Sequence, residues 1–176
     1  ACLVGSEMCI RDSLIRSLTA NLHTDDTVML GAGDDCAVLK FGNRELLFKT
    51  DAIVEGVHFD SNAAPDEVGH KALARALSDI AAMGGTPSHC LITLGTNTEI
   101  KIGYIEKVYE GLKKCAENYN VNIVGGETTT MANFTLSVSL LGTAEKVITR
   151  SGSISGDAIF VTGELGGSIT KHHLHF

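Results

Sequence analysis

Four acidic residues stand beside or inside predicted strands and helices, where carboxylates need an explanation. Asp35 precedes the strand-like run 36–41, and Asp51 lies in the strand-like run 45–54. Aspartate is depleted from strands because it packs poorly on a pleated surface, so these two acids suggest a site that holds cations. Two further acids complete the set, Asp79 within a predicted helix and Glu127 after two glycines.

Asp79 shares the apolar face of its predicted helix. Ala72, Ala76 and Ile80 fall on that face by the three-and-four spacing of a helix. A carboxylate among apolar residues carries a desolvation cost unless it is paired or bound to a metal. We favour a ligand role, although Asp79 could instead pair with Arg75, four residues earlier.

The type of these side chains indicates Mg²⁺ as the cation. Hard oxygen ligands spread over several elements suit Mg²⁺, which also takes water and substrate phosphates as ligands, whereas zinc prefers His or Cys. We therefore expect Asp35, Asp51, Asp79 and Glu127 to converge. A structural interpretation stays open, because acids also cap strands and turns, and the Gly-Gly-Glu triplet at 125–127 resembles many ordinary turns.

Composition narrows the class of protein. The chain has 176 residues, 44% of them hydrophobic, which suits one domain with one substantial core. Its net charge of -7 argues against a nucleic-acid or anionic-membrane partner, and no run approaches the roughly 20 apolar residues of a membrane span. The five cysteines lack C-x-x-C spacing, which favours a reducing cytoplasm over a disulfide framework or zinc ribbon.

The two ends of the chain lack the regular apolar spacing of the residues between them. Residues 1–13 combine two cysteines with a broken apolar pattern and are interpreted as a non-native stretch. The chain stops at KHHLHF after a glycine-rich turn, so residues 166–176 are interpreted as the start of an interdomain connection. The predicted domain is 14–165.

Apolar periodicity and turn residues predict the elements in between. Gly42 and Asn43 indicate a hairpin turn, Pro65 begins a helix, and Gly84 and Gly85 end it. The expected helices are 14 to about 23, 65 to about 83, and 101–119; the expected strands are 36–41, 45–54, 89–94 (buried), 121–124, 134–140 and 157–162.

Five motifs occur in order along this framework, and together they resemble a known family. The family is thiamine-monophosphate kinase, of the aminoimidazole ribonucleotide synthetase-like superfamily. The motifs are GAGDD (31–35), KTDAIVEGVHF (49–59), VGHKALARALSDIAAMGG (68–85), VNIVGGETT (121–129) and ITRSGSISGDAIFVTGELGGS (148–168).

The resemblance implies phosphorylation of thiamine monophosphate to thiamine diphosphate by direct transfer from ATP, with Mg²⁺. Carried over by motif, Mg²⁺ would be bound by Asp35, Thr50, Asp51, Asp79 and Glu127. ATP would contact Gly126 and Arg150, and the thiamine phosphate would contact His58. Without the motifs, Arg150 would be interpreted as a solvated strand-end residue and His58 as a structural histidine.

The resemblance also implies an α+β fold with a mixed, largely antiparallel sheet and helices on one face. Two such domains are expected to pair their sheets in a homodimer. The family usually has Asp at the position of Glu127, and a second domain that completes the substrate pocket, so the fragment alone is expected to be inactive. Two alternatives stay open: another ATP-using small-molecule kinase or synthetase of the superfamily, and a non-catalytic dimerisation or nucleotide-binding module.

Overall fold

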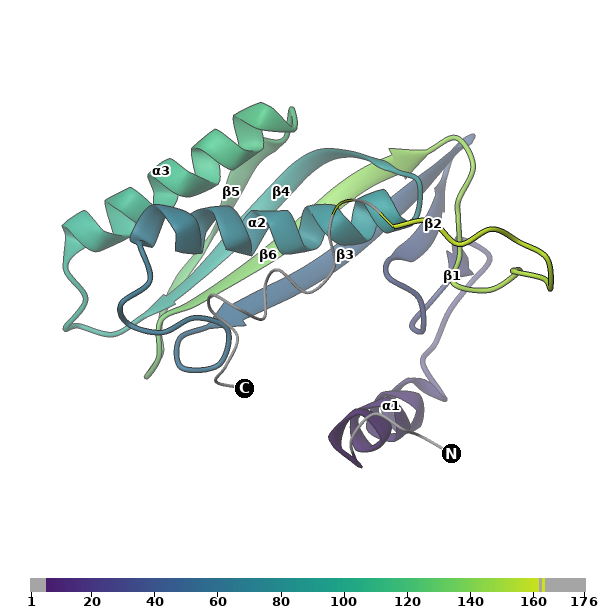
Figure 1. Ribbon diagram of the computed structural model, residues 1–176, viewed down its shortest axis with the longest axis horizontal. Coiled ribbons are helices and arrows are strands. Elements are labelled where there is room, and N and C mark those ends of the chain that lie inside the picture. The colour runs from purple at the N-terminus through teal and green to yellow at the C-terminus, as the bar shows by residue number, and fades with distance from the viewer. Residues whose placement is uncertain (1–5, 162, 164–176) are drawn as a thin grey trace.

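The computed structural model describes residues 6–161 and residue 163, with only the backbone described for residues 6–12. This part of the chain contains three helices and six strands, arranged as a sheet with helices packed on it (Figure 1). The helices are α1 (Ser6–Thr19), α2 (Pro65–Ala82) and α3 (Ile102–Asn118). The strands are β1 (Val28–Leu30), β2 (Ala37–Phe41), β3 (Arg44–Val54), β4 (Thr86–Thr96), β5 (Asn122–Thr130) and β6 (Thr135–Ala144).

The strands form a single mixed sheet in the order β1-β2-β3-β6-β4-β5. Every neighbouring pair is antiparallel except β4 and β5, which are parallel. The predicted hairpin is confirmed, because Phe41 pairs with Arg44 across a turn in which Gly42 has a φ of 61°. The predicted mixed, largely antiparallel sheet is confirmed as well.

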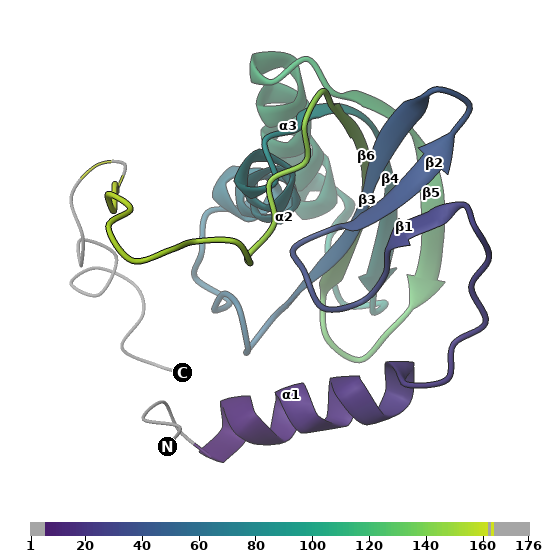
Figure 2. The same cartoon turned by 90° about the vertical axis from the view of Figure 1, so that its right-hand side faces the viewer.

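Helices α2 and α3 cover one face of the sheet and leave the other open (Figure 2). The central strand β6 shows why, since residues 135–142 alternate between partly exposed and buried. Leu136, Val138 and Leu140 are fully buried under the helices, while Ser137 and Ser139 point to the other side, called the open face below. The predicted placement of helices on one face is confirmed.

Two glycines allow α2 and α3 to pack closely. A Cβ atom on Gly69 of α2 would lie 1.9 Å from the Val108 carbonyl oxygen, and one on Gly111 of α3 would lie 1.9 Å from the Asp66 carbonyl oxygen. These distances are far below van der Waals contact, so only glycine fits at the two positions. The close crossing holds both helices against the sheet.

Helix α1 differs from its prediction at both ends. It begins at Ser6, inside the stretch interpreted as non-native, and it ends at Thr19 instead of near His23. Its apolar side chains stay exposed, with Leu14 at 55% and Leu18 at 67%. The spacing of Leu22 therefore did not extend the helix, because no packing surface stabilises a further turn.

Strands β4 and β5 are longer than predicted. The predicted buried strand 89–94 is wrong in its burial, since β4 alternates and leaves Leu91 48% exposed on the open face. In β5, Gly126 lies within the strand and pairs with Ile92 of β4. A Cβ on Gly126 would lie 1.7 Å from the Ile92 carbonyl oxygen, so the glycine permits close strand approach and does not mark a strand end.

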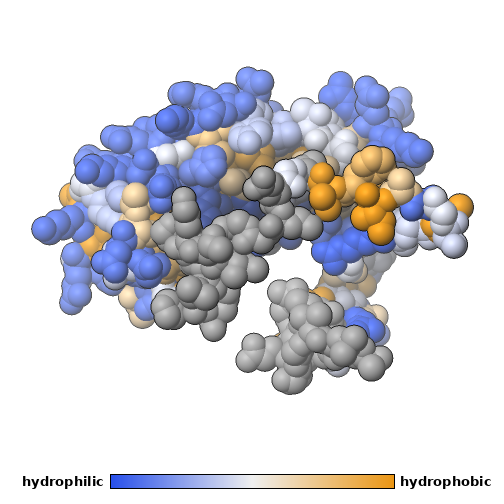
Figure 3. Space-filling view, viewed as in Figure 1, coloured by the Kyte–Doolittle hydropathy of each residue, from blue (hydrophilic) through white to orange (hydrophobic). Residues whose placement is uncertain are grey.

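The strand predicted at 157–162 is not found in its described residues, 157–161. A strand requires hydrogen bonds from a neighbouring backbone, and no described strand pairs with this segment. Ile159 and Phe160 are 94% and 88% exposed. Apolar side chains are visible on the surface along the segment that follows β6 (Figure 3). Residue 162 and the predicted connection 166–176 lie outside the described residues.

Candidate functional site

The loop before β2 places two carboxylates against Arg150. The Asp34 carboxylate accepts hydrogen bonds from the backbone N–H of Asp35 (2.9 Å) and from the backbone N–H of Arg150 (3.1 Å). The Arg150 guanidinium donates to Asp35 Oδ1 from Nε at 3.1 Å and also from Nη2. The bond to Asp35 and its charge raise the pKa of Arg150. Two predicted site residues, 115 positions apart, are thus brought together.

Asp79 pairs with Lys49, across the interface between α2 and β3. Lys49 Nζ lies 2.5 Å from Asp79 Oδ2, and the side chains are only 23% and 24% exposed. The alternative pairing of Asp79 with Arg75 is wrong, because Arg75 turns to Asp51, with Nε 3.6 Å from Oδ2. The cation at Asp79 comes from the sheet and not from the same helix.

The buried thiol of Cys36 marks the point where these acids meet. Burial and the charges of Asp79, Asp35 and Asp34, against the opposing effect of Lys49, raise the pKa of Cys36 to about 11. All four charged groups therefore lie within electrostatic reach of one sulfur atom. We call Asp34, Asp35 and Asp79, with Lys49 and Arg150, the acidic cluster.

A cavity of about 840 Å³ opens beside the acidic cluster. Its wall combines flexible backbone at 31–33 with the charged side chains of Asp34, Asp35, Lys49 and Arg150. Such a lining can meet an anionic ligand with backbone N–H groups and the cations Arg16, Lys49 and Arg150. The remaining lining residues are Ile15, Cys36, Ala37, Phe48 and Thr50.

Thr50 and Asp51 are separated by the sheet. Successive side chains of a strand point to opposite faces. Asp51 pairs with Val138, which is buried under the helices, whereas Thr50 pairs with Ser139 on the open face. Ser139 Oγ lies 3.3 Å from Thr50 Oγ1. The two neighbours therefore approach any ligand from different sides of β3.

His58 belongs to a basic group beside Asp51. The backbone N–H of Val54 donates to His58 Nδ1 at 3.0 Å, which assigns the proton of the neutral ring to Nε2. Lys71 Nζ donates to the His58 carbonyl oxygen at 2.5 Å. Burial lowers the pKa of His58, and the charges of Arg75 and Lys71 lower it further. Together these residues provide positive charge and an N–H donor at one place.

Glu127 and Gly126 lie far from the other predicted residues. Glu127 pairs with Thr93, which pairs with Ser137, so its side chain is on the open face. Strand β5 is separated from β3 by β6 and β4, which is roughly 14 Å at the usual strand spacing. Glu127 Oε1 instead accepts the backbone N–H of Thr128 at 2.9 Å.

The expected convergence of four carboxylates is therefore wrong within the described part of this chain. Among the described residues, no three or more His, Cys, Asp or Glu side chains are grouped so as to hold a metal ion. The charges of Asp35 and Asp79 both act on Cys36, and the oxygen atoms of these two side chains are the donors that Mg²⁺ prefers. Donor type fits the ion, but Lys49 and Arg150 now neutralise these carboxylates.

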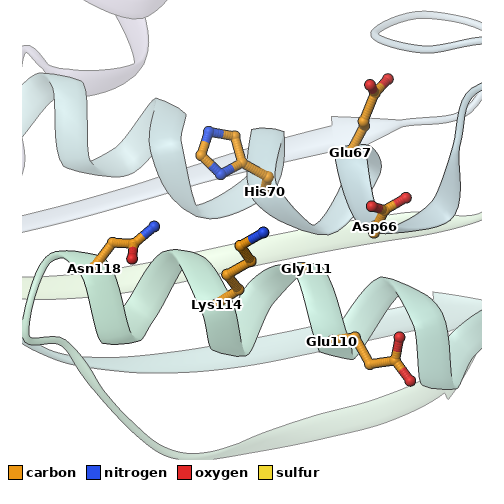
Figure 4. A pocket seen from close by; sticks show the side chains of 7 residues that line it. All are labelled: Asp66, Glu67, His70, Glu110, Gly111, Lys114 and Asn118. Atoms are coloured by element: carbon orange, nitrogen blue, oxygen red, sulfur yellow. The ribbon is translucent and has the colours of Figure 1, made fainter.

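A second cavity lies over the crossing of α2 and α3 and contains none of the predicted site residues. It measures about 490 Å³ and is lined from both helices (Figure 4). Its acids Asp66 and Glu67 occupy the first turn of α2, where the helix dipole favours negative charge. The cavity follows from the close helix crossing, and nothing in it matches the chemistry predicted from the motifs. Its other lining residues are His70, Glu110, Gly111, Lys114 and Asn118.

Comparison with known proteins decides the family. Residues 33–144 match the family model described as AIR synthase related protein, N-terminal domain. The chain belongs to this family. The matched range contains the acidic cluster except Arg150. It also contains strands β2 to β6 and helices α2 and α3.

Several curated proteins similar to this chain are thiamine-monophosphate kinases. The chain is 40% identical over 157 residues to the one from Rhodopirellula baltica, covering 84% of this chain and 50% of that protein. It is 38% identical over 136 residues to the one from Aquifex aeolicus, covering 77% of this chain and 44% of that protein. The chain thus spans about half the length of these curated relatives.

A solved structure agrees with the sequence relatives. The domain superimposes on AaThiL complexed with AMPPCP and TMP with a TM-score of 0.72 and 32% identity, over 84% of this chain and 45% of that one. This agreement covers most of the sheet and its helices. The predicted fold class and the predicted resemblance are both confirmed.

Several charged residues of the site were not among the predicted ligands. Lys49 and Lys71 lie inside the motifs, but a lysine side chain is not a metal ligand. Asp34 lies beside Asp35, and only Asp35 was assigned to the metal. Alternation offered one usable signal: Lys49 and Asp51 are two residues apart on a strand and must share a face. This shared face predicts that Lys49 lies near the acidic residues between β3 and α2.

Proposed function

We propose that this chain is the ATP-binding part of a thiamine-monophosphate kinase, with residues 14–165 forming its N-terminal domain. The enzyme would transfer the terminal phosphoryl group of ATP to thiamine monophosphate and release ADP and thiamine diphosphate. One observation carries the proposal: the similarity to AaThiL complexed with AMPPCP and TMP, at a TM-score of 0.72 and 32% identity.

Phosphoryl transfer is mainly a problem of positioning and of charge neutralisation. Arg150 and Lys49 line the cavity of about 840 Å³, where both side chains offer N–H donors to bound phosphates. Gly126 lies in the Gly-Gly-Glu-Thr-Thr motif shared with the family, and we assign it an ATP contact from that motif. These features support ATP contacts by Arg150 and Gly126.

The basic group around His58 supports a role with the phosphate of the acceptor. With Nδ1 occupied by the Val54 N–H, the ring presents its Nε2–H as a donor. Lys71 and Arg75 add positive charge nearby, as their effect on the pKa of His58 indicates. We assign His58 to thiamine monophosphate binding.

We propose Mg²⁺ as the metal, with Asp35, Thr50, Asp51, Asp79 and Glu127 as its ligands. Because the sheet separates Thr50 from Asp51, and Glu127 lies far from β3, these five residues would serve more than one ion. When bound, Mg²⁺ would neutralise the phosphate charge that builds up during transfer. The carboxylates themselves orient cations: Asp35 holds Arg150 at 3.1 Å, and Asp51 holds Arg75 at 3.6 Å. The protein thus positions its guanidinium groups through the same acids that are proposed as metal ligands.

We also propose a homodimer formed through the open face of the sheet. Phe48 and Leu91 are 43% and 48% exposed there, and burying such apolar area stabilises association. Thr50 and Glu127 point to this face, so pairing would enclose them. None of the helices in the described part is long and apolar enough to cross a membrane, and the free thiols of Cys36, Cys90 and Cys115 suit the cytoplasmic location that we propose.

The test uses the longest protein that contains this chain. Purified protein is supplied with ATP, Mg²⁺ and thiamine monophosphate, and ADP release is measured alongside formation of thiamine diphosphate. We expect turnover that requires thiamine monophosphate. Nucleotide binding without such turnover would indicate another ATP-using member of the superfamily, and no nucleotide binding at millimolar ATP would indicate a non-catalytic module.

A matched pair of variants tests the nucleotide site by calorimetry. Arg150→Met removes the guanidinium that lines the cavity, whereas Arg44→Met removes an exposed guanidinium at the start of β3. We expect Arg150→Met to weaken binding of a non-hydrolysable ATP analogue about tenfold or more, as expected for loss of a charge-assisted contact. Equal affinity of the two variants would contradict the assignment of Arg150.

A further inference from the structure

Lys49 is held more tightly than an ordinary surface lysine. It lies on β3, on the face that α2 covers, and pairs with the fully buried Leu140 of β6. Its neighbours on the same face of β3 are Leu47, which is fully buried, and Asp51. Its side chain is 23% exposed, so the charge is largely removed from water. A lysine in this position needs a partner.

The partner is Asp79, with Nζ and Oδ2 2.5 Å apart. Asp79 is itself 24% exposed and lies near Asp34 and Asp35. The charges of these carboxylates repel one another, and two cations of the described chain pair with them, Lys49 with Asp79 and Arg150 with Asp34 and Asp35. Arg150 pairs with Asp35 and is 64% exposed, so Lys49 is the cation that neutralises the inner side of the cluster.

We propose that Lys49 is a built-in counter-ion of the acidic cluster, which competes with a divalent cation for Asp79. An ammonium group and a metal ion cannot occupy the same carboxylate oxygen at 2.5 Å. A metal at Asp79 must therefore either displace the ammonium group or share one carboxylate with it, and the repulsion between the two cations disfavours sharing. The inference rests on the proposed function for the identity of the cation, but the competition concerns only residues of this chain.

The competition has a measurable consequence. Binding to a minor state lowers the apparent affinity by the fraction of molecules in that state. If the pair is open in about one molecule in ten, the affinity for Mg²⁺ falls about tenfold. Removing the ammonium group should raise the affinity for Mg²⁺ by that factor and leave the cluster under-neutralised when the metal is absent.

The experiment is a titration of thermal unfolding with MgCl₂, without nucleotide, on the longest protein that contains this chain. The variants are Lys49→Met and, as a control with the same charge change, Lys113→Met on the exposed side of α3. We expect Lys49→Met to unfold at a lower temperature than the wild type without metal. Its Mg²⁺ midpoint should lie about tenfold lower, while Lys113→Met behaves as the wild type.

Two further variants test whether the effect comes from the Lys49–Asp79 pair. Lys49→Gln retains length and polarity if Lys49→Met fails to fold, and it should show the same shift of midpoint. Lys49→Met with Asp79→Asn should lose both the destabilisation and the increased response to Mg²⁺. Equal midpoints for wild type and Lys49→Gln, or no response to Mg²⁺ in any variant, would overturn the inference. Because no substrate is present, failure of the kinase assay leaves this result unaffected.

Discussion

At the scale of single residues, His58 makes stability depend on pH. Burial and the charges of Arg75 and Lys71 lower the pKa of His58 from its ordinary value of 6.5. The unfolded chain then binds a proton that the folded chain does not, so stability is fully present above pH about 6.5 and falls as the pH drops toward the folded pKa.

The prediction concerns the slope of melting temperature against pH in that window. His58→Asn keeps an acceptor for the Val54 N–H but cannot titrate, so its slope below pH about 6.5 should be shallower than that of the wild type. His23→Asn, in the exposed segment after α1, serves as the control. Parallel curves for wild type and His58→Asn would contradict the role of burial at His58.

Gly125 and Gly126 form a matched pair on β5. Both have positive φ, 151° and 158°, so alanine is similarly strained at either position. A Cβ on Gly125 would lie 3.6 Å from a Leu91 side-chain carbon, whereas one on Gly126 would lie 1.7 Å from the Ile92 carbonyl oxygen.

We therefore expect Gly126→Ala to lower the free energy of unfolding by about 2 kcal/mol more than Gly125→Ala, since backbone must move to admit the methyl group. Urea denaturation of both variants measures the difference. Equal losses would show that the positive φ alone determines the choice of glycine at this point of β5.

At the scale of elements, the packing of α2 on α3 depends on glycine at their crossing. Gly111→Ala would place a Cβ 1.9 Å from the Asp66 carbonyl oxygen, which forces the helices apart. The expected loss is about 2 kcal/mol or more in free energy of unfolding. Gly103→Ala in the same helix meets no atom within 4 Å and should be neutral or stabilising by up to about 1 kcal/mol. Urea denaturation distinguishes the two.

The helices and strands were predicted well from the sequence where each packs against other elements of the described chain. Helices α2 and α3, the hairpin of β2 and β3, and β6 all match their patterns, because each packs against described neighbours. The prediction was wrong where no described neighbour pairs with the segment, as at Ile159 and Phe160, which were expected to lie in a strand at 157–162.

The site was predictable in part for the same reason. Asp35 and Arg150 were predicted from their motifs and lie together, but the counter-ion of Asp79 was not, since it comes from another element. A helical spacing suggested Arg75, whereas packing of α2 on β3 brings Lys49 closer. Local spacing cannot decide between partners when tertiary contacts offer a better one.

At the scale of the whole molecule, the sheet has one covered face and one open face. Leu91 lies on the open face next to Ser139 and Gly125, and it is 48% exposed. If two copies pair through this face, Leu91 lies in the interface, and a charge there would be buried without a partner.

Leu91→Glu should therefore convert a dimer into a monomer at micromolar concentration, as measured by analytical ultracentrifugation. Ile102→Glu provides the matched control, because Ile102 is 74% exposed at the start of α3, on the helix side of the molecule. We expect the control to remain dimeric and to keep its melting temperature. A Leu91→Glu variant that stays dimeric would move the interface away from the open face. It would then follow that Thr50 and Glu127, which point to that face, are not enclosed by pairing, and their proposed part in the metal site would lose its support.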